Sequence, residues 1–265
     1  MKIETITSAQ NPKIKTLLNL QEKSKTRRQE GLFVTEGKRE LLHCLEAGYK
    51  PHTIFVCQEI MQEGDLEQIA SYCACNFIDI PRNLYEKVAY RGSTEGVIAE
   101  MHCKDMTLES LDIKENPLIV VLESVEKPGN LGAVLRSADA AGADAVIVCD
   151  PLTDMYNPNL IRSSIGALFT VPVATASSEE TIRWLKDKGI RIYTAQLQDS
   201  EWYYDTDMRK GTAIIMGTEA KGLTGIWREA ADAHIKIPML GRLDSLNVSV
   251  SAAILMFEAV RQRNL

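Results

Sequence analysis

The feature that most constrains the fold is the strand, loop and helix at residues 235–260 of the 265-residue chain. Ile235 and Ile237 predict a short strand, which a polar loop containing Pro and Gly follows. The helix predicted over residues 248–260 is apolar nearly all round, so we expect it to be buried on most faces. Polar loops between a strand and a buried helix line ligand crevices in α/β sheets, although an ordinary strand–helix crossover has the same pattern.

The same order of strand, polar loop and helix occurs twice more upstream. Residues 118–123 are apolar enough to be buried on both faces, as in a parallel sheet, and a Gly-containing loop and a helix follow as far as Gly142. Residues 212–216 form another apolar strand with a Gly-containing loop after it. Shorter strands and helices alternate over the first hundred residues. The chain is therefore predicted to be an α/β protein.

Apolar residues become sparse and charged residues frequent between Cys103 and Pro117. That change predicts a linker over residues 105–116, between an N-terminal domain of residues 1–104 and a C-terminal domain of residues 117–265. A chain of this length holds enough apolar residues for two small cores.

The charge is unevenly distributed although the net charge is −6. Residues 1–40 hold nine basic and five acidic residues, and the run from Lys23 to Arg28, which we interpret as a connector, is the most basic part. A basic end on an acidic chain favours a surface that meets a nucleic-acid backbone, but a solvated helix face would have the same composition.

Several classes of site are excluded by their missing motifs. The chain has neither a Walker A sequence nor a dinucleotide fingerprint, and the C-terminal domain has a single histidine, His234, which argues against a nucleophilic triad. The six cysteines form no Cys-x-x-Cys pair, so we expect no metal site and reduced thiols. Neither a membrane-spanning apolar run nor a signal peptide is apparent, so we expect a soluble, cytoplasmic protein.

These loops contain few residues suited to general acid–base catalysis, and methyl transfer from a sulfonium cofactor needs few of them. Its leaving group is already activated, so the protein mainly aligns donor and acceptor. The residues permit this chemistry without demonstrating it.

Three motifs resemble those of the SpoU/TrmH branch of the SPOUT RNA methyltransferases. They are Pro-Gly-Asn-Leu-Gly-x-x-x-Arg at 128–136, Ile-Met-Gly-Thr-Glu-x-x-Gly at 215–222, and Ile-Pro-Met with Ser-Leu-Asn-Val-Ser at 237–249. Their order, spacing and flanking elements agree over residues 118–263. The first domain also resembles the substrate-binding domain of the longer family members, through Ile-Thr-Ser-x-x-Asn-Pro at 6–12 and Leu-Phe-Val-x-Glu-Gly at 32–37.

The resemblance implies a C-terminal trefoil-knotted SPOUT methyltransferase domain with a smaller N-terminal α/β RNA-binding domain of ribosomal-protein type. It implies a homodimer formed through the C-terminal domain, with S-adenosylmethionine as cofactor. The reaction implied is methylation of a ribose 2′-hydroxyl in RNA. The N-terminal domain favours ribosomal RNA by analogy, and the alternatives are transfer RNA or a catalytically inactive RNA-binding protein of the same fold.

The resemblance also assigns five catalytic candidates: Asn130, Arg136, Glu219, Ser245 and Asn247. Asn130 positions the substrate, Glu219 orients Arg136 or the ribose, and Asn247 faces the reacting groups. A guanidinium is a poor base because its ordinary pKa exceeds about 12, so for Arg136 we favour gripping a phosphate and polarising the hydroxyl. Each residue has a plainer reading, as a turn residue, a surface charge, an acid at a helix N-terminus or a helix cap.

For the cofactor, the family's contacts are carried by Gly217, Ile237 and Leu246, and we expect three further residues to be their neighbours: Thr194, Ala195 and Met239. Gly217 is the strongest physical case, because a backbone without a Cβ can approach a ligand closely. The RNA-binding candidates are basic residues of the first domain: Lys23, Lys25, Arg27, Arg28 and Arg91. Many relatives have His-Gln-Gly where this chain has Thr94-Glu95-Gly96, which puts RNA handling by residues 91–96 in doubt.

Overall fold

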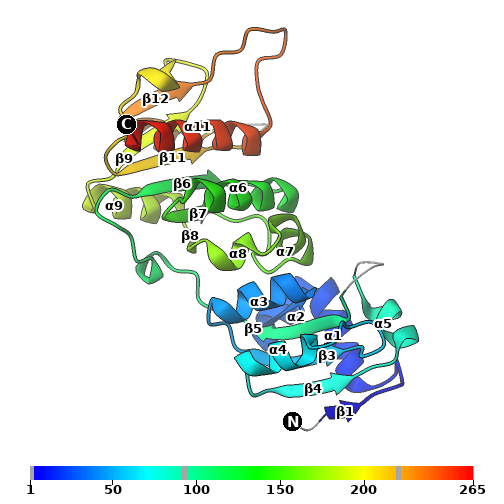
Figure 1. The fold of residues 1–265 in the computed structure, drawn as a ribbon. Coiled ribbons are helices and arrows are strands. Elements are labelled where there is room, and N and C mark those ends of the chain that lie inside the picture. Colours follow the sequence, from blue (N-terminus) through cyan, green and yellow to red (C-terminus); the bar gives the residue numbers. More distant parts are fainter. Residues whose placement is uncertain (1–2, 91–94, 219–221, 265) are drawn as a thin grey trace. The chain divides into compact units, whose positions relative to one another are not determined.

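The structure is a computed structural model that describes residues 3–90, 95–218 and 222–264. The chain forms two compact units, one of residues 1–104 with 154–170 and one of residues 105–153 with 171–265 (Figure 1). This division differs from the one expected from the sequence, because residues 154–170 group with the first unit. The chain therefore passes between the units three times.

The first unit is built on a mixed sheet of five strands in the order β1-β4-β3-β5-β2. Strands β1, β4 and β3 are parallel, and β5 is antiparallel to both β3 and β2. The strands are β1 (Ile3–Thr5), β2 (Leu32–Glu36), β3 (Pro51–Val56), β4 (Asn76–Asp79) and β5 (Val97–His102). The helices are α1 (Pro12–Glu22), α2 (Ser24–Glu30), α3 (Lys38–Glu46), α4 (Asp65–Tyr72), α5 (Arg82–Val88), α7 (Pro158–Ser164) and α8 (Ala167–Thr170).

The basic run that we interpreted as a connector is in fact helical. Lys23 has an extended backbone, with φ −116° and ψ 111°, which ends α1, and α2 begins at the next residue. Gly31 then takes a left-handed conformation with φ 64° and ends α2 directly before β2. Glycine adopts that conformation without the steric cost that a Cβ imposes.

Aromatic packing explains why residues 154–170 belong to the first unit. The ring of Tyr156 stacks on that of Phe33 with centroids 4.4 Å apart, and the ring centroid of Phe169 lies 5.7 Å from that of Phe33. The Tyr156 hydroxyl accepts a hydrogen bond from the Lys104 amide at 2.9 Å and donates one to the Lys104 carbonyl at 3.1 Å. Large aromatic side chains contribute much buried area, so this segment completes the core of the first unit.

The second unit is built on a parallel sheet of seven strands in the order β10-β12-β9-β11-β6-β7-β8. The strands are β6 (Leu118–Glu123), β7 (Ala145–Cys149), β8 (Val173–Ala176), β9 (Arg191–Ala195), β10 (Glu201–Trp202), β11 (Thr212–Met216) and β12 (Ala233–Lys236). The helices are η1 (Leu108–Ser110), α6 (Pro128–Ala141), α9 (Ser178–Asp187), η2 (Tyr203–Asp205), α10 (Gly225–Ala230) and α11 (Val248–Arg263). Within the residues that the structure describes, no helix combines the length and the apolarity needed to cross a bilayer.

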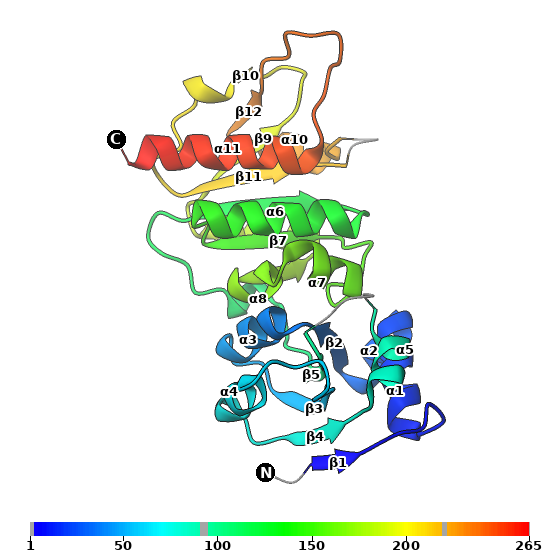
Figure 2. The same ribbon diagram turned by 45° about the vertical axis from the view of Figure 1, so that its right-hand side comes forward.

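Helices cover both faces of this sheet, as its apolar strands require. Helices α6 and α11 pack against each other on one face (Figure 2). Helices α9 and α10 cover the other face, where Leu185 and Trp227 join side chains of β6, β7, β9 and β11 in one core. The α/β fold predicted from the sequence is confirmed, and the trefoil knot stays a prediction.

The burial of α11 differs from our expectation. Ala252, Leu255 and Met256 are buried as expected, but Val250 and Phe257 are 46% and 48% exposed. A helix that is apolar all round is therefore covered on only one side in the single chain. Large exposed apolar side chains on one helix face indicate a contact surface.

Candidate active site

Two cavities lie where the order of the second unit's strands reverses. From β6 the chain adds β7 and β8 on one side, whereas β11, β9 and β12 lie on the other. The carboxyl ends of β6 and β11 therefore border the switch point at which α/β sheets bind ligands.

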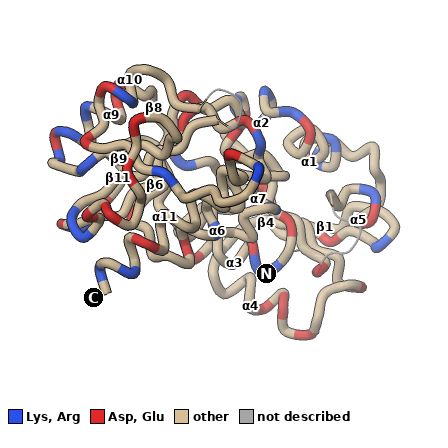
Figure 3. Tube along the Cα trace, turned by 90° about the horizontal axis from the view of Figure 1, so that it is seen from above, with Lys and Arg blue, Asp and Glu red and all other residues tan. Residues whose placement is uncertain are grey.

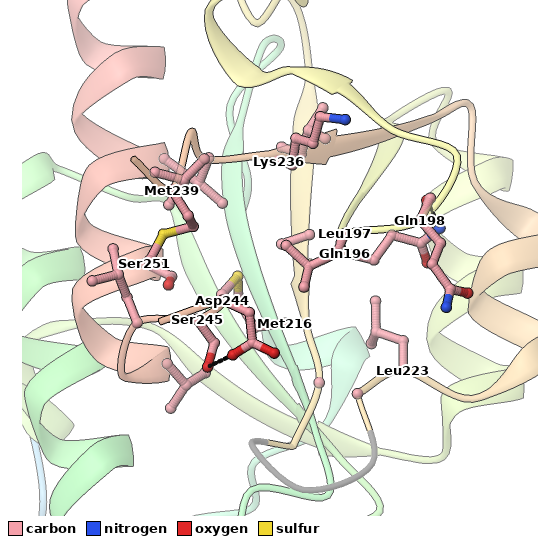
Figure 4. A pocket seen from close by; sticks show the side chains of 18 of the residues that line it. Gln196, Leu197, Gln198, Met216, Leu223, Lys236, Met239, Asp244, Ser245 and Ser251 are labelled. Carbon is pink, nitrogen blue, oxygen red and sulfur yellow. Dashed lines mark hydrogen bonds between the residues drawn. The ribbon is translucent and has the colours of Figure 1, made fainter. Parts of the chain in front are cut away.

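The first cavity lies beyond the ends of β9, β11 and β12 and has a volume of about 320 Å³. Its wall is mostly apolar, with polar side chains from a few positions, as is usual for cofactor sites. Figure 4 shows Met216, Leu223 and Met239 around it, together with the carboxylate of Asp244, which accepts a hydrogen bond from the Ser245 hydroxyl at 3.2 Å. We call this cavity the cofactor crevice.

Five of the six predicted cofactor residues line this crevice: Ala195, Gly217, Ile237, Met239 and Leu246. The sixth, Thr194, is fully buried on β9 and does not line it. Its hydroxyl lies 2.6 Å from Nδ1 of His234. Thr194 therefore lies behind the wall of the crevice, where it contacts His234, and is not part of the wall itself.

The loop after β11 explains the glycine at 217. Thr218 and Gly222 form an isolated antiparallel bridge, with Thr218 N donating to Gly222 O at 3.2 Å and Gly222 N donating to Thr218 O at 2.9 Å. A Cβ on Gly217 would lie 2.3 Å from the carbonyl carbon of Gly222. The close approach that requires glycine is thus to the loop's own backbone, whereas we had expected a ligand there.

The second cavity, of about 360 Å³, lies between the segment after β6 and the loop after β11. It shares Gly217, Thr218, Gly222 and Val248 with the wall of the cofactor crevice. We call it the β6–β11 cavity. The two cavities are therefore neighbours.

One hydrogen bond joins the first and third motifs beside the β6–β11 cavity. Asn130, on the first turn of α6, lines that cavity, and Asn247 Nδ2 donates to its Oδ1 at 3.2 Å. Asn247 also caps α11, because its Oδ1 accepts from Ser249 N at 3.0 Å. Asn247 thus occupies a capping position and a site position together.

The other catalytic candidates are placed less closely together. Arg136 is exposed on α6 and lines neither cavity; six residues of helix separate it from Asn130 by about 9 Å along the axis. Ser245 lines the cofactor crevice. Glu219 lies outside the residues that the structure describes.

Several polar residues of the cofactor crevice were not among our sequence candidates, and they include Gln198, Arg228, Lys236 and Asp244. Gln198 and Lys236 follow or end strands that reach the same sheet edge, so strand ends were the available signal. Arg228 lies on α10, and only tertiary packing brings that helix to the crevice.

The predicted RNA-binding residues divide into three groups. Lys23, Lys25 and Arg28 are exposed on or beside α2, where Figure 3 shows basic positions. Arg27 is 3% exposed, and it donates to Asp154 Oδ2 at 2.7 Å and to two carbonyls, so including it among RNA contacts was wrong. Arg91 lies outside the described residues.

Burial keeps the cysteine thiols protonated. Desolvation raises the pKa of Cys149 and of Cys75 to about 12, and it raises the pKa of Cys44 further. The thiolate is the reactive form of cysteine, so these three thiols are poor nucleophiles near neutral pH. Across residues 3–90, 95–218 and 222–264, no cluster of three metal-ligating side chains is suited to a metal ion.

Comparisons with known proteins agree with this geometry. Residues 117–257 match the model of the SpoU rRNA Methylase family, and residues 11–99 match an MRM3-like substrate binding domain. The 23S rRNA (guanosine(2553)-2′-O)-methyltransferase RlmP of Bacillus subtilis is 29% identical over 96% of this chain and 98% of its own length. A 23S rRNA (uridine(2479)-2′-O)-methyltransferase of Streptomyces viridochromogenes is 30% identical over 89% of this chain and 85% of its own length.

A solved structure supports the cofactor assignment. An AdoMet-bound rRNA methyltransferase from Sinorhizobium meliloti superimposes with a TM-score of 0.89 at 29% identity, covering 98% of both chains. A parallel sheet with a crevice at its switch point defines the class of α/β enzymes that bind a nucleotide-like cofactor. Within that class, this chain belongs to the SpoU rRNA Methylase family and is an S-adenosylmethionine-dependent RNA 2′-O-ribose methyltransferase.

Proposed function

We propose that this enzyme methylates a ribose 2′-hydroxyl in the RNA of the large ribosomal subunit, in the cytoplasm. The relatives that match nearly its whole length act on 23S rRNA by name. Their names give guanosine in one and uridine in the other, so they leave open the base that this chain modifies. The observation that carries the proposal is the pair of adjoining cavities, with Asn130 and Asn247 bonded beside them.

The cofactor crevice fits S-adenosylmethionine in size and chemistry. A cavity of about 320 Å³ is in the range of small-molecule sites, and its apolar wall suits an adenine ring. Arg228 and Lys236 can attract the cofactor's carboxylate, and Asp244 can accept hydrogen bonds from its ribose or amino group. When bound, the cofactor supplies an activated methyl group, and the crevice fixes the direction in which that group faces.

The β6–β11 cavity is where we place the target nucleotide. It shares a wall with the cofactor crevice, so a ribose bound there would lie next to the methyl donor. In this arrangement the Asn130 and Asn247 amides orient the ribose through hydrogen bonds, and alignment of the reacting atoms alone can supply several kcal/mol.

Arg136 and Glu219 complete the proposed catalytic group, on the basis of the motifs alone. Arg136 is a solvent-exposed cation that lies about 9 Å along α6 from Asn130, so it can hold a phosphate of the RNA strand whose ribose Asn130 orients. A guanidinium that binds this phosphate would also polarise the adjacent 2′-hydroxyl. Ser245 would contribute from the crevice side.

A homodimer through the C-terminal domain is supported by α11. Val250 and Phe257 are about half exposed on a helix that packs against α6, and Leu240 and Leu243 of the preceding loop are 97% and 77% exposed. Covering these side chains with a second copy would remove the largest apolar exposure of this helix and loop from water.

The first unit is the proposed RNA-binding part. Its match to a substrate binding domain and the exposed Lys23, Lys25 and Arg28 support this role. Lysine and arginine bind phosphates and release counterions, so the binding should weaken as salt rises.

Transfer of labelled methyl from S-adenosylmethionine to separate ribosomal and transfer RNA pools tests the proposal. The pools should come from cells that lack this protein. We expect alkali-resistant label in large-subunit RNA. Label in transfer RNA would overturn the substrate, and absence of label despite cofactor binding would favour an RNA-binding protein without catalysis.

A further inference from the structure

Glu123 is a buried carboxylate at the carboxyl end of β6, and none of the three motifs includes it. It is 3% exposed, and it lies one residue before Ser124, whose φ of 52° turns the chain out of the strand. A buried carboxylate is costly unless hydrogen bonds satisfy both of its oxygens. Its partners therefore show what the residue does.

Both carboxylate oxygens of Glu123 bind Thr224. The Thr224 amide donates to Oε2 at 2.9 Å, and the Thr224 hydroxyl donates to Oε1 at 2.6 Å. Thr224 is the N-cap of α10 and stands two residues after Gly222, which closes the loop of the second motif. Glu123 thus ties the end of β6 to the end of that loop, although 101 residues separate the two partners in the chain.

The bonds between Glu123 and Thr224 lie next to the wall that the two cavities share. Glu123 and Thr224 both line the β6–β11 cavity, and Gly217, Thr218 and Gly222 line both cavities. The backbone of Gly217 lies against that of Gly222, so a shift of Gly222 would also displace Gly217. A displacement of Thr224 would be passed directly to Gly222 and to the wall of the cofactor crevice.

A second hydrogen bond holds α10 through Trp227. Trp227 Nε1 donates to Ser178 Oγ at 3.1 Å, and Ser178 Oγ lies 2.7 Å from Asp150 Oδ2 and 3.5 Å from Glu123 Oε1. This bond fixes the position of α10 against α9 but does not contact the loop of the second motif. Two separate contacts can therefore be altered: Glu123 holds the end of the second-motif loop at Thr224, and Ser178 holds α10 at Trp227.

We propose that Glu123 is a positioning residue for methyl transfer. Its carboxylate holds Thr224, and through it Gly222 and the adjoining Gly217, in the positions that form the wall of the cofactor crevice. The residue needs no contact with the cofactor or the ribose for this role. Its loss should weaken cofactor binding by the enzyme even when no RNA is present.

Glu123→Met tests this proposal, with Trp227→Phe as the matched control. The methionine keeps the approximate length of the side chain but lacks both carboxylate oxygens, so the Thr224 amide and the Thr224 hydroxyl both lose their acceptor. We expect the Kd for S-adenosylmethionine to rise about tenfold, which corresponds to about 1.4 kcal/mol. Trp227→Phe removes the bond between α10 and Ser178 but keeps both bonds between Glu123 and Thr224, so it should lower the thermal midpoint while leaving the Kd within about twofold.

Binding is measured by calorimetry without RNA, at a temperature where circular dichroism shows that each variant is folded. Hydrogen exchange of the Thr224 amide gives a second readout, and it should be faster only in Glu123→Met. An unchanged Kd in Glu123→Met, or an equal rise in Trp227→Phe, would overturn the proposal. Because RNA takes no part, a wrong RNA substrate would not affect the result.

Thr224→Val covers the case in which Glu123→Met does not fold. Valine removes the hydroxyl donor and keeps the amide donor, so the carboxylate retains one bond. The Kd should then rise by about threefold, a smaller change than the removal of both bonds would cause. A Kd equal to that of the wild-type enzyme would again contradict the proposal.

Discussion

At the scale of single residues, positions with two uses are the most informative. Asn247 caps α11 with its side-chain oxygen and donates to Asn130 with its amide nitrogen, so the cap and the site are the same residue. Arg136 is the opposite case, because no hydrogen bond or ion pair joins it to any other residue that the structure describes. Within the described part of the chain, this exposed cation is therefore available to an RNA phosphate.

Replacing Arg136 with alanine should abolish most of the methyl transfer without affecting cofactor binding. Loss of a charged group that acts on the reacting hydroxyl typically lowers kcat by about 10²–10³-fold. The cofactor crevice does not include Arg136, so the Kd for S-adenosylmethionine should stay within a few-fold. Single-turnover methylation and calorimetry measure the two quantities.

Arg183→Ala is the control, because Arg183 is an exposed arginine on α9 that lines neither cavity. Equal rates for Arg136→Ala and Arg183→Ala would remove Arg136 from the mechanism.

At the scale of elements, neighbouring arginines of α2 have different roles. Arg27 points inward to Asp154 and to the carbonyls of Leu20 and Gln21, and Arg28 is exposed. The helix is therefore held to the segment 154–170 by one arginine and can present the other to RNA.

Arg27→Ala should destabilise the first unit, and Arg28→Ala should not. Removing Arg27 leaves the mostly buried Asp154 carboxylate without its partner, and breaking such a pair costs about 3–5 kcal/mol. Surface substitutions such as Arg28→Ala stay within about 0.5 kcal/mol. Thermal unfolding should show a lowered midpoint for the first variant alone. Similar midpoints for the two variants would mean that the buried pair contributes little.

RNA binding should respond to the exposed basic residues of the same element. Changing Lys23, Lys25 and Arg28 together to glutamine should lower the affinity for ribosomal RNA. It should also flatten the plot of log K against log salt by about 0.7–0.9 for each phosphate that is no longer neutralised. Filter binding at several salt concentrations measures both effects.

A control with the same change in charge separates direct binding by α2 from general electrostatics. It replaces three basic residues at the end of α9, namely Arg183, Lys186 and Lys188. The same salt slope in both triple variants would assign the effect to net charge and not to α2.

At the scale of the whole molecule, the exposed face of α11 is the surface through which we propose that two copies associate. Apolar residues occupy both sides of this helix, but the single chain buries only the side that packs against α6, β6 and β11. A second copy is the partner that would cover the rest.

Phe257→Glu should convert the enzyme to a monomer. A carboxylate placed in an apolar interface is stripped of its hydration without gaining a partner, which strongly disfavours association. Sedimentation equilibrium should report the mass of one chain, against two for the unaltered enzyme. Ile226→Glu, at an exposed position of α10 on the other face of the sheet, should keep the mass of two. An unchanged mass for Phe257→Glu would place the dimer interface elsewhere.

Local sequence patterns were enough to predict most elements. The strands at 118–123 and 212–216 are mostly apolar, and the loops after them contain the glycines and polar residues that reach the sheet edge. The resemblance to the family supplied the six cofactor candidates, and five of them line the crevice because they lie at or after strand ends.

Tertiary structure alone decided the features that depend on residues distant in sequence. The pairing of Glu123 with Thr224, the bonds of Arg27 with Asp154, and the grouping of residues 154–170 with the first unit all join segments far apart in the chain. Periodicity shows which side of an element is apolar or charged, but it does not show what packs against that side. For that reason the sequence predicted the strands, loops and motifs of this enzyme, whereas only folding determined which of its charged groups are buried as supports and which are free to bind.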